Sequence, residues 1–283
     1  MADSTFRETR MPRHLSVPFY QVDAFTNQAF SGNPAAVCIL EQELPADTML
    51  RVAAEMNLSE TAFVQPMARD GARKLQWFTP AVEVPLCGHA TLATSHVLLR
   101  EMGEAAPLRF DTLSGILTVE ETGDGWLAMD FPADPPTSTP APKGLLEALG
   151  CPPSATTAQG VKLWVVRLGS PEEVLALDPD MSRLSKVDLG DTPLGVSVTA
   201  PGNGGVDFVS RFFGPWVGVD EDPVTGMAHT VLGPYWMAEL GTESLRARQV
   251  SARGGDLRVT RREERIVVAG RAVTVVRGLL DLS

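Results

Sequence analysis

One glutamate lies where a carboxylate could move a proton. Glu60 lies in the segment Asn57–Val64, at the point where an expected helix ends and an apolar strand begins. Its neighbours Leu58, Ala62 and Phe63 can keep water away from the carboxylate. A desolvated carboxyl has a raised pKa, which brings it toward the working range of a general acid or base. The alternative on spacing alone is an ordinary glutamate in a surface turn.

Two further candidates lie at the starts of expected apolar helices. Gly88 opens one helix directly after Cys87, and Gly226 follows Asp222 at the start of the other. Backbone N–H groups are free at a helix N-terminus, so each start could hold a carboxylate or an oxyanion. Two ordinary helix N-caps explain the same residues equally well, and Asp222 is a good capping residue.

An internal repeat relates these two helix starts. Phe78–Val84 and Phe213–Val219 share Phe, Pro and two Val residues in register, and a second short match follows in the same order. The first match sets Cys87 and Asp222 in equivalent positions at the starts of the two helices. A chain of two similar halves is therefore expected, and face-to-face packing of the halves would bring both helix starts into one cleft.

Each half is expected to contain strands around one buried helix. Gly88–Leu99 and Thr225–Leu240 are apolar on nearly every side, which is typical of a buried helix. Strands are expected at Phe19–Phe25 and Ala35–Leu40, where β-forming residues are bounded by turn residues. A further helix is expected to start from a cap at Asp47.

The domain organisation follows from the repeat. Residues 1–16 are polar and form an expected N-terminal tail, without the apolar core of a signal peptide. The first lobe is expected at 17–131 and the second at 143–283, and the strands at the two chain ends are free to cross between the lobes. Residues 132–142 are rich in Pro, Thr and Ser, and they are the expected linker.

Composition excludes several classes of protein. The 283 residues carry a formal net charge of −11, with 24 Lys and Arg against 35 Asp and Glu. This balance argues against nucleic-acid binding, which needs clustered cations, but it allows a small anionic substrate. No apolar stretch approaches the roughly 18 residues of a membrane span. The cysteines are odd in number and widely spaced, so disulfides are not expected and the cytoplasm is the expected compartment.

The motifs predict no cofactor and no metal. The chain has no glycine-rich dinucleotide loop, no phosphate-binding loop and no metalloprotease motif. His89 and His96 lie on one expected helix, but their spacing does not make a metal-ligand cluster. Histidines of the core or of a helix end are the simpler interpretation.

These motifs together resemble the PhzF-like family, the phenazine biosynthesis-like isomerases. The resemblance covers nearly the whole chain and rests on five ordered segments: Asp23–Val37, Met56–Phe63, Trp77–Ala93, Arg211–His229 and Gln249–Leu257. It implies an α+β fold of the diaminopimelate epimerase-like kind, in which two pseudo-symmetric lobes each wrap a curved sheet or barrel around a central helix. It also implies an active site between the lobes, a homodimer, and catalysis without metal or organic cofactor.

The resemblance also implies roles for individual residues. Glu60 matches the glutamate that shuttles a proton in the characterised phenazine enzyme, and His89 and Asp222 match residues associated with substrate binding and proton handling. One departure is Met227, which stands where the family commonly has a substrate-holding serine; methionine cannot donate a hydrogen bond. The substrate-binding residues implied by the resemblance are Gly88, Thr225, Gly226, Met227 and Asn33.

The leading functional hypothesis is a cofactor-independent isomerase of a small carboxylated substrate. Glu60 would carry a proton from one carbon to another, while the helix N-termini at Gly88 and Gly226 steady the negative charge that develops. An epimerase or racemase that uses Cys87 and Asp222 as two opposed bases is the first alternative. A non-catalytic binding or regulatory protein on the same scaffold is the second.

Overall fold

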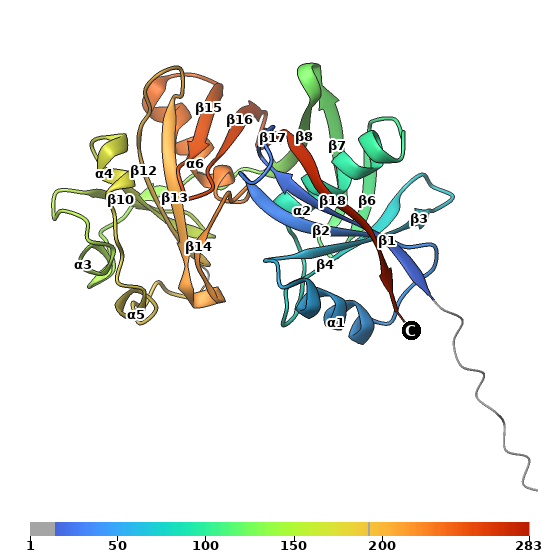
Figure 1. Cartoon of the computed structure of the whole chain (residues 1–283). Coiled ribbons are helices and arrows are strands. Elements are labelled where there is room, and N and C mark those ends of the chain that lie inside the picture. Colours follow the sequence, from blue (N-terminus) through green and yellow to red (C-terminus); the bar gives the residue numbers. More distant parts are fainter. Residues whose placement is uncertain (1–14, 192, 283) are drawn as a thin grey trace, which may run out of the picture.

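The computed structural model describes residues 15–191 and 193–282 (Figure 1). The strands of this part of the chain belong to one continuous hydrogen-bonded sheet of 18 strands. The first half of the chain lies on the right of Figure 1, together with the C-terminal strand, and the rest of the second half lies mainly on the left. The expected tail at 1–16 lies outside the described residues except for its last two. No helix in the described ranges is long and apolar enough to cross a membrane.

The first half contributes eight strands, and the C-terminal strand joins them. These strands are β1 (Ser16–Ala24), β2 (Asn33–Ile39), β3 (Thr61–Met67), β4 (Arg73–Phe78), β5 (Glu83–Val84), β6 (Leu108–Thr112), β7 (Gly115–Thr122), β8 (Trp126–Pro132) and β18 (Ala272–Asp281). β18 pairs with β1, which pairs with β2, so the last strand lies beside the first strand (Figure 1). The strands expected near the N-terminus are therefore present as β1 and β2, with slightly shifted ends.

The second half contributes the remaining strands. They are β9 (Thr137–Ser138), β10 (Thr156–Gln159), β11 (Leu163–Arg167), β12 (Gly195–Pro201), β13 (Phe208–Gly214), β14 (Val219–Asp222), β15 (Ser244–Gln249), β16 (Gly255–Arg262) and β17 (Arg265–Gly270). β17 pairs with β8 and so joins the two halves into one sheet. The strand β9 lies inside the segment expected to be a plain linker, and it pairs with β10. The lobe boundaries at 131 and 143 stay a prediction.

The strand pairings of the first half recur in the second half in the same order. β3 pairs parallel to β2, and β12 pairs parallel to β11. β4 pairs with β3, with β5 and, in parallel, with β6; β13 pairs in the same way with β12, β14 and β15. Two antiparallel pairings follow in each half, β6–β7–β8 and β15–β16–β17. This order agrees with the repeat seen in the sequence, and the mixed sheet with few helices agrees with the α+β class.

Two helices lie inside the curved sheet. α2 (Gly88–His96) continues as a π-helix over Val97–Glu101 and packs against β1, β2, β3, β8 and β18. α6 (His229–Leu240) packs against β15, β16 and β17. One large apolar cluster contains side chains of both helices, including Leu92 and Trp236. A helix that is apolar on every side is stable only when it is enclosed in this way.

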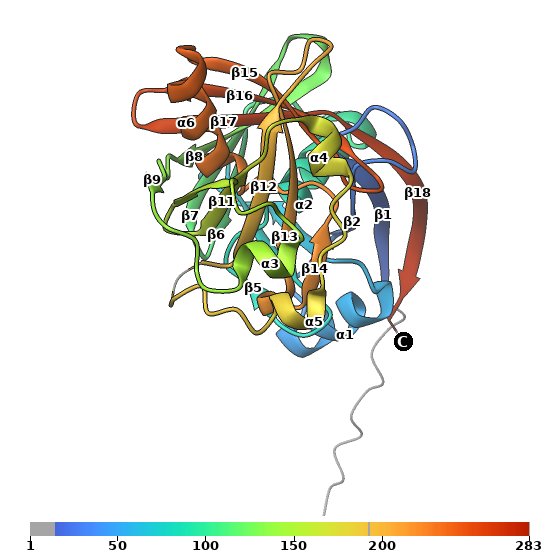
Figure 2. The same ribbon diagram turned by 90° about the vertical axis from the view of Figure 1, so that its left-hand side faces the viewer.

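The other helices are peripheral. α1 (Ala46–Met56) packs against β3 and β4. Three short helices, α3 (Leu145–Leu149), α4 (Pro171–Leu175) and α5 (Met181–Leu184), lie on the outer side of the second half (Figure 2). The expected cap of α1 is wrong, because Pro45 is the N-cap residue and Asp47 lies in the first turn. In the first turn, the negative charge of Asp47 still interacts favourably with the positive end of the helix dipole.

The start of α6 also differs from the expectation. The helix begins at His229, because Gly226, Met227 and Ala228 form a preceding turn. Asp222 is the last residue of β14 and not a helix N-cap. Extra residues between β14 and α6 therefore separate Asp222 from its helix, whereas Cys87 is the N-cap of α2.

We expect Gly32→Ala to lower the free energy of unfolding by about 3 kcal/mol, which would be measured by urea denaturation. Gly32 has φ +67°, and a Cβ at this position would lie 2.2 Å from the backbone oxygen of Ala24. Gly71→Ala is the matched control, because Gly71 has φ +79° with nothing within 4 Å of an added Cβ. In the control, the free energy of unfolding should fall by only about 1 kcal/mol, the cost of a positive φ for alanine. An equal fall in both variants would contradict the close contact at Gly32.

Candidate active site

The local fold directs Glu60 toward α2. Asn57 ends α1 in the left-handed conformation, with φ 50°, which asparagine tolerates better than most residues. The chain then turns, and the backbone oxygen of Glu60 accepts a hydrogen bond from Ala36 N at 3.4 Å. The Glu60 side chain is 19% exposed, and its Oε2 lies 3.3 Å from Nε2 of His89. The structure therefore places Glu60 in a half-buried position and not in an open surface turn.

The start of α2 supplies the partners of Glu60. His89, which is 6% exposed, lies in the first turn of the helix, directly after Cys87 and Gly88. The Cys87 Sγ lies 3.5 Å from the His89 Nδ1, and the Ser59 Oγ lies 3.5 Å from the His89 Nε2. The imidazole thus lies between a thiol on one side and a carboxylate and a hydroxyl on the other.

Asp222 is held by donors on both of its carboxylate oxygens. Asn33 Nδ2 donates to Oδ1 at 2.8 Å, and the Thr225 hydroxyl donates to Oδ2. Asn33 begins β2 and is fully buried, and it also donates to the backbone oxygen of Val224 at 2.9 Å. Its own Oδ1 is buried without a partner among the described residues. A side chain of the first half therefore fixes the carboxylate of the second half.

Hydrogen bonds from Arg253 hold the segment before Asn33 in place. The Arg253 guanidinium donates to the backbone oxygens of Gly32 at 2.7 Å and Ser31 at 3.0 Å. It also donates to Asp23 Oδ1 at 2.8 Å, and Asp23 is 1% exposed. Charge-assisted bonds of this kind are stronger than neutral ones. They tie the loop after β1 to the loop after β15, next to the site.

Gly88, at the start of α2, lies close to Gly226, in the turn before α6. A Cβ placed on Gly88 would lie 3.7 Å from Cα of Gly226, and one placed on Gly226 would lie 3.3 Å from the Phe25 ring. Gly88, the first residue of α2, and Gly226, in the turn before α6, therefore lie next to each other, and the cleft expected between the helix starts stays a prediction. Met227, which follows Gly226, is half-buried and packs against the main apolar cluster. A side chain at Gly226 would press on the Phe25 ring, whereas a Cβ at Gly88 would make only an ordinary contact.

Burial shifts the pKa values of all four groups toward their neutral forms. Burial raises the pKa of Glu60 and of Asp222. Burial lowers the pKa of His89, and the charge of Asp222 opposes that shift. Burial, together with the charge of Glu60, raises the pKa of the Cys87 thiol well above its ordinary value. A raised carboxyl pKa is the property that was expected of Glu60 as a general acid or base.

Sequence reasoning missed the role of Gln249 in this site. Gln249 is fully buried at the end of β15, and its Nε2 donates to the backbone oxygen of Asp222 at 2.7 Å. Its Oε1 accepts from the backbone N–H of Thr225 at 2.9 Å. The available signal was strand alternation, because Leu245, Ala247 and Gln249 share the buried face of β15. A glutamine on that face must find internal hydrogen-bond partners.

The expectation of no metal-ligand cluster considered only the spacing of histidines along the chain. The fold brings ligand atoms of Glu60, Cys87 and His89 within 4.8 Å of one another. Two of these residues come from the start of α2 and one from the segment before β3. A three-ligand group is therefore present, although no single stretch of sequence contains it.

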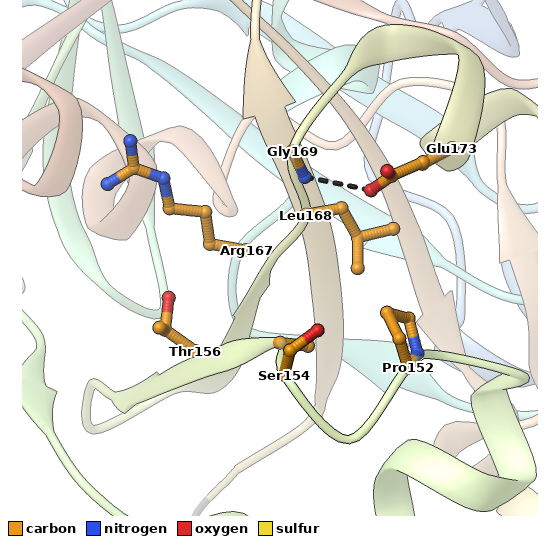
Figure 3. A pocket seen from close by; sticks show the side chains of 8 residues that line it. Pro152, Ser154, Thr156, Arg167, Leu168, Gly169 and Glu173 are labelled. Carbon is orange, nitrogen blue, oxygen red and sulfur yellow. Dashed lines mark hydrogen bonds between the residues drawn. The ribbon is translucent and has the colours of Figure 1, made fainter.

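A surface pocket of about 310 Å³ lies elsewhere, between the β10–β11 strands and α4 (Figure 3). Its lining includes Ser154, Arg167 and Glu173, and Glu173 accepts a hydrogen bond from Gly169 N. None of the expected site residues lines this pocket. The group around Glu60 and His89 therefore stays the candidate active site, despite the volume of this pocket.

The arrangement of sheet and helices is an α+β fold that is similar to the fold of solved epimerases. A hydroxyproline epimerase from Agrobacterium vitis has a similar structure, with a TM-score of 0.59 over 94% of this chain and 93% of that one. Its identity is 11%, which shows the fold alone. The chain belongs to the family of phenazine biosynthesis-like proteins, whose profile matches residues 22–278.

Individual relatives match over almost the full chain. A Pseudomonas aeruginosa protein named as an uncharacterized isomerase is 49% identical over 271 residues, covering 95% of this chain and 100% of the relative. The crystal structure of a PhzF family phenazine biosynthesis protein from Enterococcus faecalis has a TM-score of 0.87 and 41% identity, covering 94% of this chain and 99% of that one. These relatives confirm the resemblance to the PhzF-like family and agree with the expectation of an enzyme.

Proposed function

We propose that this protein is an isomerase of a small carboxylated substrate, in which Glu60 takes a proton from one carbon and returns it to another. The observation that carries the proposal is the half-buried Glu60 carboxylate, 3.3 Å from His89 at the start of α2, where Gly88 approaches Gly226. The isomerase name of the P. aeruginosa relative supports the reaction class.

The proton balance of this reaction needs no second reactant. The ionised Glu60 takes the proton, and the electron pair of the broken C–H bond stays in the substrate as a delocalised anion. The same proton then returns to a different carbon, so nothing is oxidised and no group leaves. The raised pKa of Glu60 supports this role, because it makes the difference in pKa between Glu60 and a weakly acidic C–H group of the substrate smaller.

Other groups are suited to holding the substrate. Free backbone N–H groups at the start of a helix stabilise a developing negative charge. The buried Oδ1 of Asn33 offers an acceptor that no described residue uses. Both oxygens of Asp222 already accept hydrogen bonds, so Asp222 is better placed to orient its neighbours and to favour a protonated His89 than to act as a free base.

Proton NMR in D₂O tests the proposal directly. The wild-type protein and the Glu60→Gln variant would be incubated with a panel of small carboxylates that includes dihydro-hydroxyanthranilate and several amino and hydroxy acids. We expect deuterium incorporation or isomerisation of at least one compound by the wild type and its loss in Glu60→Gln. Ligand binding without exchange, unaffected by Glu60→Gln, would instead favour a non-catalytic binding protein.

An epimerase or racemase is the second candidate, because the Cys87 thiol lies inside the same site, 3.5 Å from the His89 ring. If Cys87 were one of two opposed bases, Cys87→Ser would abolish exchange. We expect Cys87→Ser to retain at least about a tenth of the wild-type exchange rate, because Glu60 and His89 remain in place. Complete loss with a correctly folded variant would favour the epimerase.

Three accompanying expectations belong to the proposal. The substrate is a small anion, the protein is a homodimer, and its compartment is the cytoplasm. Light scattering of the purified chain would test the dimer, and fractionation of cells that express it would test the compartment.

A further inference from the structure

Three kinds of metal ligand meet inside the site, although the proposed reaction needs only one of them as its proton carrier. A carboxylate, a thiol and an imidazole offer ligand atoms within 4.8 Å of one another: Glu60, Cys87 and His89. We propose that these three side chains form an inhibitory zinc site, where a Zn²⁺ ion binds reversibly and stops proton transfer.

One ligand pair already has the separation found in a tetrahedral zinc site, and all three ligand atoms lie within 4.8 Å of one another. Zinc bonds of about 2.0–2.3 Å to O, N and S place neighbouring ligand atoms roughly 3.3–3.6 Å apart. The His89 Nε2 lies 3.3 Å from the Glu60 Oε2, and the His89 Nδ1 lies 3.5 Å from the Cys87 Sγ. One ion binds only one ring nitrogen of His89. If it binds Nε2 together with Glu60, rotation of the Cys87 side chain would bring the thiol to the same ion.

The backbone fixes all three ligands. Cys87 and His89 lie at the start of α2, and Glu60 directly precedes β3 and is hydrogen-bonded to β2. Cys87 and His89 are both 6% exposed, so the ion would lie in surroundings of low dielectric, where its attraction to a thiolate and a carboxylate is strong. Three protein ligands leave the fourth position open for water.

The ligand set also favours zinc over hard cations. A thiolate is a soft ligand, whereas magnesium and calcium bind oxygen atoms almost exclusively. When zinc binds, the Cys87 S–H bond breaks, an S–Zn bond forms, and the proton leaves to solvent. His89 binds as the neutral imidazole, and Glu60 as the carboxylate. No electrons are transferred, so the site is fully restored when a chelator removes the ion.

Inhibition follows from the use of Glu60, and this part rests on the proposed function. A carboxylate oxygen that is bonded to zinc cannot take a proton from a substrate carbon. Zinc also places a positive charge and a bound water where the substrate must approach Glu60 and His89. The binding of zinc itself does not depend on which reaction the protein catalyses.

Zinc binding would be measured on the full chain by competition with a chromophoric chelator. We expect one equivalent of Zn²⁺ per chain, an affinity at least about 100-fold weaker in Cys87→Ser and in His89→Asn, and no competition from Mg²⁺. Cys151→Ser and His96→Asn are the matched controls, because Cys151 and His96 lie outside the group, and both should bind zinc as the wild type does. With Co²⁺ as the probe, the wild type should show a thiolate-to-cobalt absorption band that Cys87→Ser lacks.

Two results would overturn the site: no zinc binding by the wild type, or a zinc affinity of Cys87→Ser and His89→Asn that equals the affinity of the wild type. Circular dichroism of each variant would establish that a lost affinity is not a loss of folding. Inhibition would be read from substrate deuterium exchange, and exchange that continues with zinc bound would overturn the inhibitory role. Absence of exchange in the metal-free protein would count against the proposed isomerase and leave the zinc titration unaffected.

Discussion

Glu60→Gln is expected to lower the turnover number by about 10²–10⁴-fold, the range that a positioned general acid or base contributes. Glutamine keeps the size and polarity of the side chain but cannot take a proton. Initial rates of deuterium exchange would be compared with those of Glu55→Gln, a matched change at an exposed residue near the end of α1. A drop of less than tenfold in Glu60→Gln would remove Glu60 as the proton carrier.

The stability of Glu60→Gln relative to the wild type should increase as the pH rises. Burial raises the pKa of Glu60, so the folded protein holds this proton to a higher pH than the unfolded chain does. The stabilising contribution of Glu60 is therefore complete below its unfolded pKa, about 4.3, and it is lost as the pH rises through the folded-state pKa. Glutamine has no proton to lose, so the variant should gain stability relative to the wild type as the pH rises above about 4.3.

Urea unfolding across this pH range would measure the difference between the two proteins. Glu55→Gln should show no such trend, because Glu55 is exposed. A difference between wild type and Glu60→Gln that stays constant with pH would contradict the burial of the carboxylate. A variant that is more stable and less active is the expected signature of a residue kept for chemistry at a cost in stability.

The sequence predicted the parts of the site that depend on local pattern. Gly88 begins one apolar helix and Gly226 lies in the turn before the other, and the repeat placed these helices in matching halves, so the approach of the two glycines could be predicted. Glu60 could be selected because it lies between a helix and a strand with apolar neighbours. In each case, the spacing along the chain determines which residues share an element, and hydrophobic periodicity determines which elements are buried.

Contacts between elements far apart in the chain were beyond this reasoning. The repeat aligned Cys87 with Asp222, but β14 is followed by a turn before α6, so Asp222 ends a strand while Cys87 caps a helix. The pairing of Asp222 with Asn33 joins β2 to β14, and no local pattern specifies it. The same holds for the ion pair of Arg253 with Asp23. Such contacts depend on how the two halves are placed, which periodicity does not encode.

Gln249→Leu is expected to lower kcat/KM by about 10- to 100-fold, although Gln249 is a positioning residue with no expected contact to the substrate. Its amide holds the Asp222 backbone oxygen and the Thr225 N–H, so it sets the direction of the Asp222 carboxylate and of the turn at Gly226. Displacement of a catalytic group by about 1 Å is enough for a loss of this size. Steady-state rates at several substrate concentrations would separate kcat from KM.

Stability must be separated from positioning in this variant. Leucine leaves a buried N–H and a buried C=O without partners, which costs about 1–3 kcal/mol each. Leu257→Ala is the matched control, because Leu257 is buried on the neighbouring strand β16 and its truncation costs about 2–5 kcal/mol. The control should lose stability while the folded protein keeps its kcat/KM. Equal losses of kcat/KM in both variants would mean that Gln249 acts through stability alone.

A third variant distinguishes geometry from packing more sharply. In Gln249→Glu, one carboxyl oxygen can still accept from Thr225 N–H, but the other faces the Asp222 backbone oxygen, which needs a donor. The protonated acid supplies that donor and the carboxylate does not. The variant should therefore approach wild-type kcat/KM at acid pH and lose it as the introduced carboxyl ionises, relative to a wild type measured over the same range. A purely structural glutamine would give a pH profile parallel to that of the wild type.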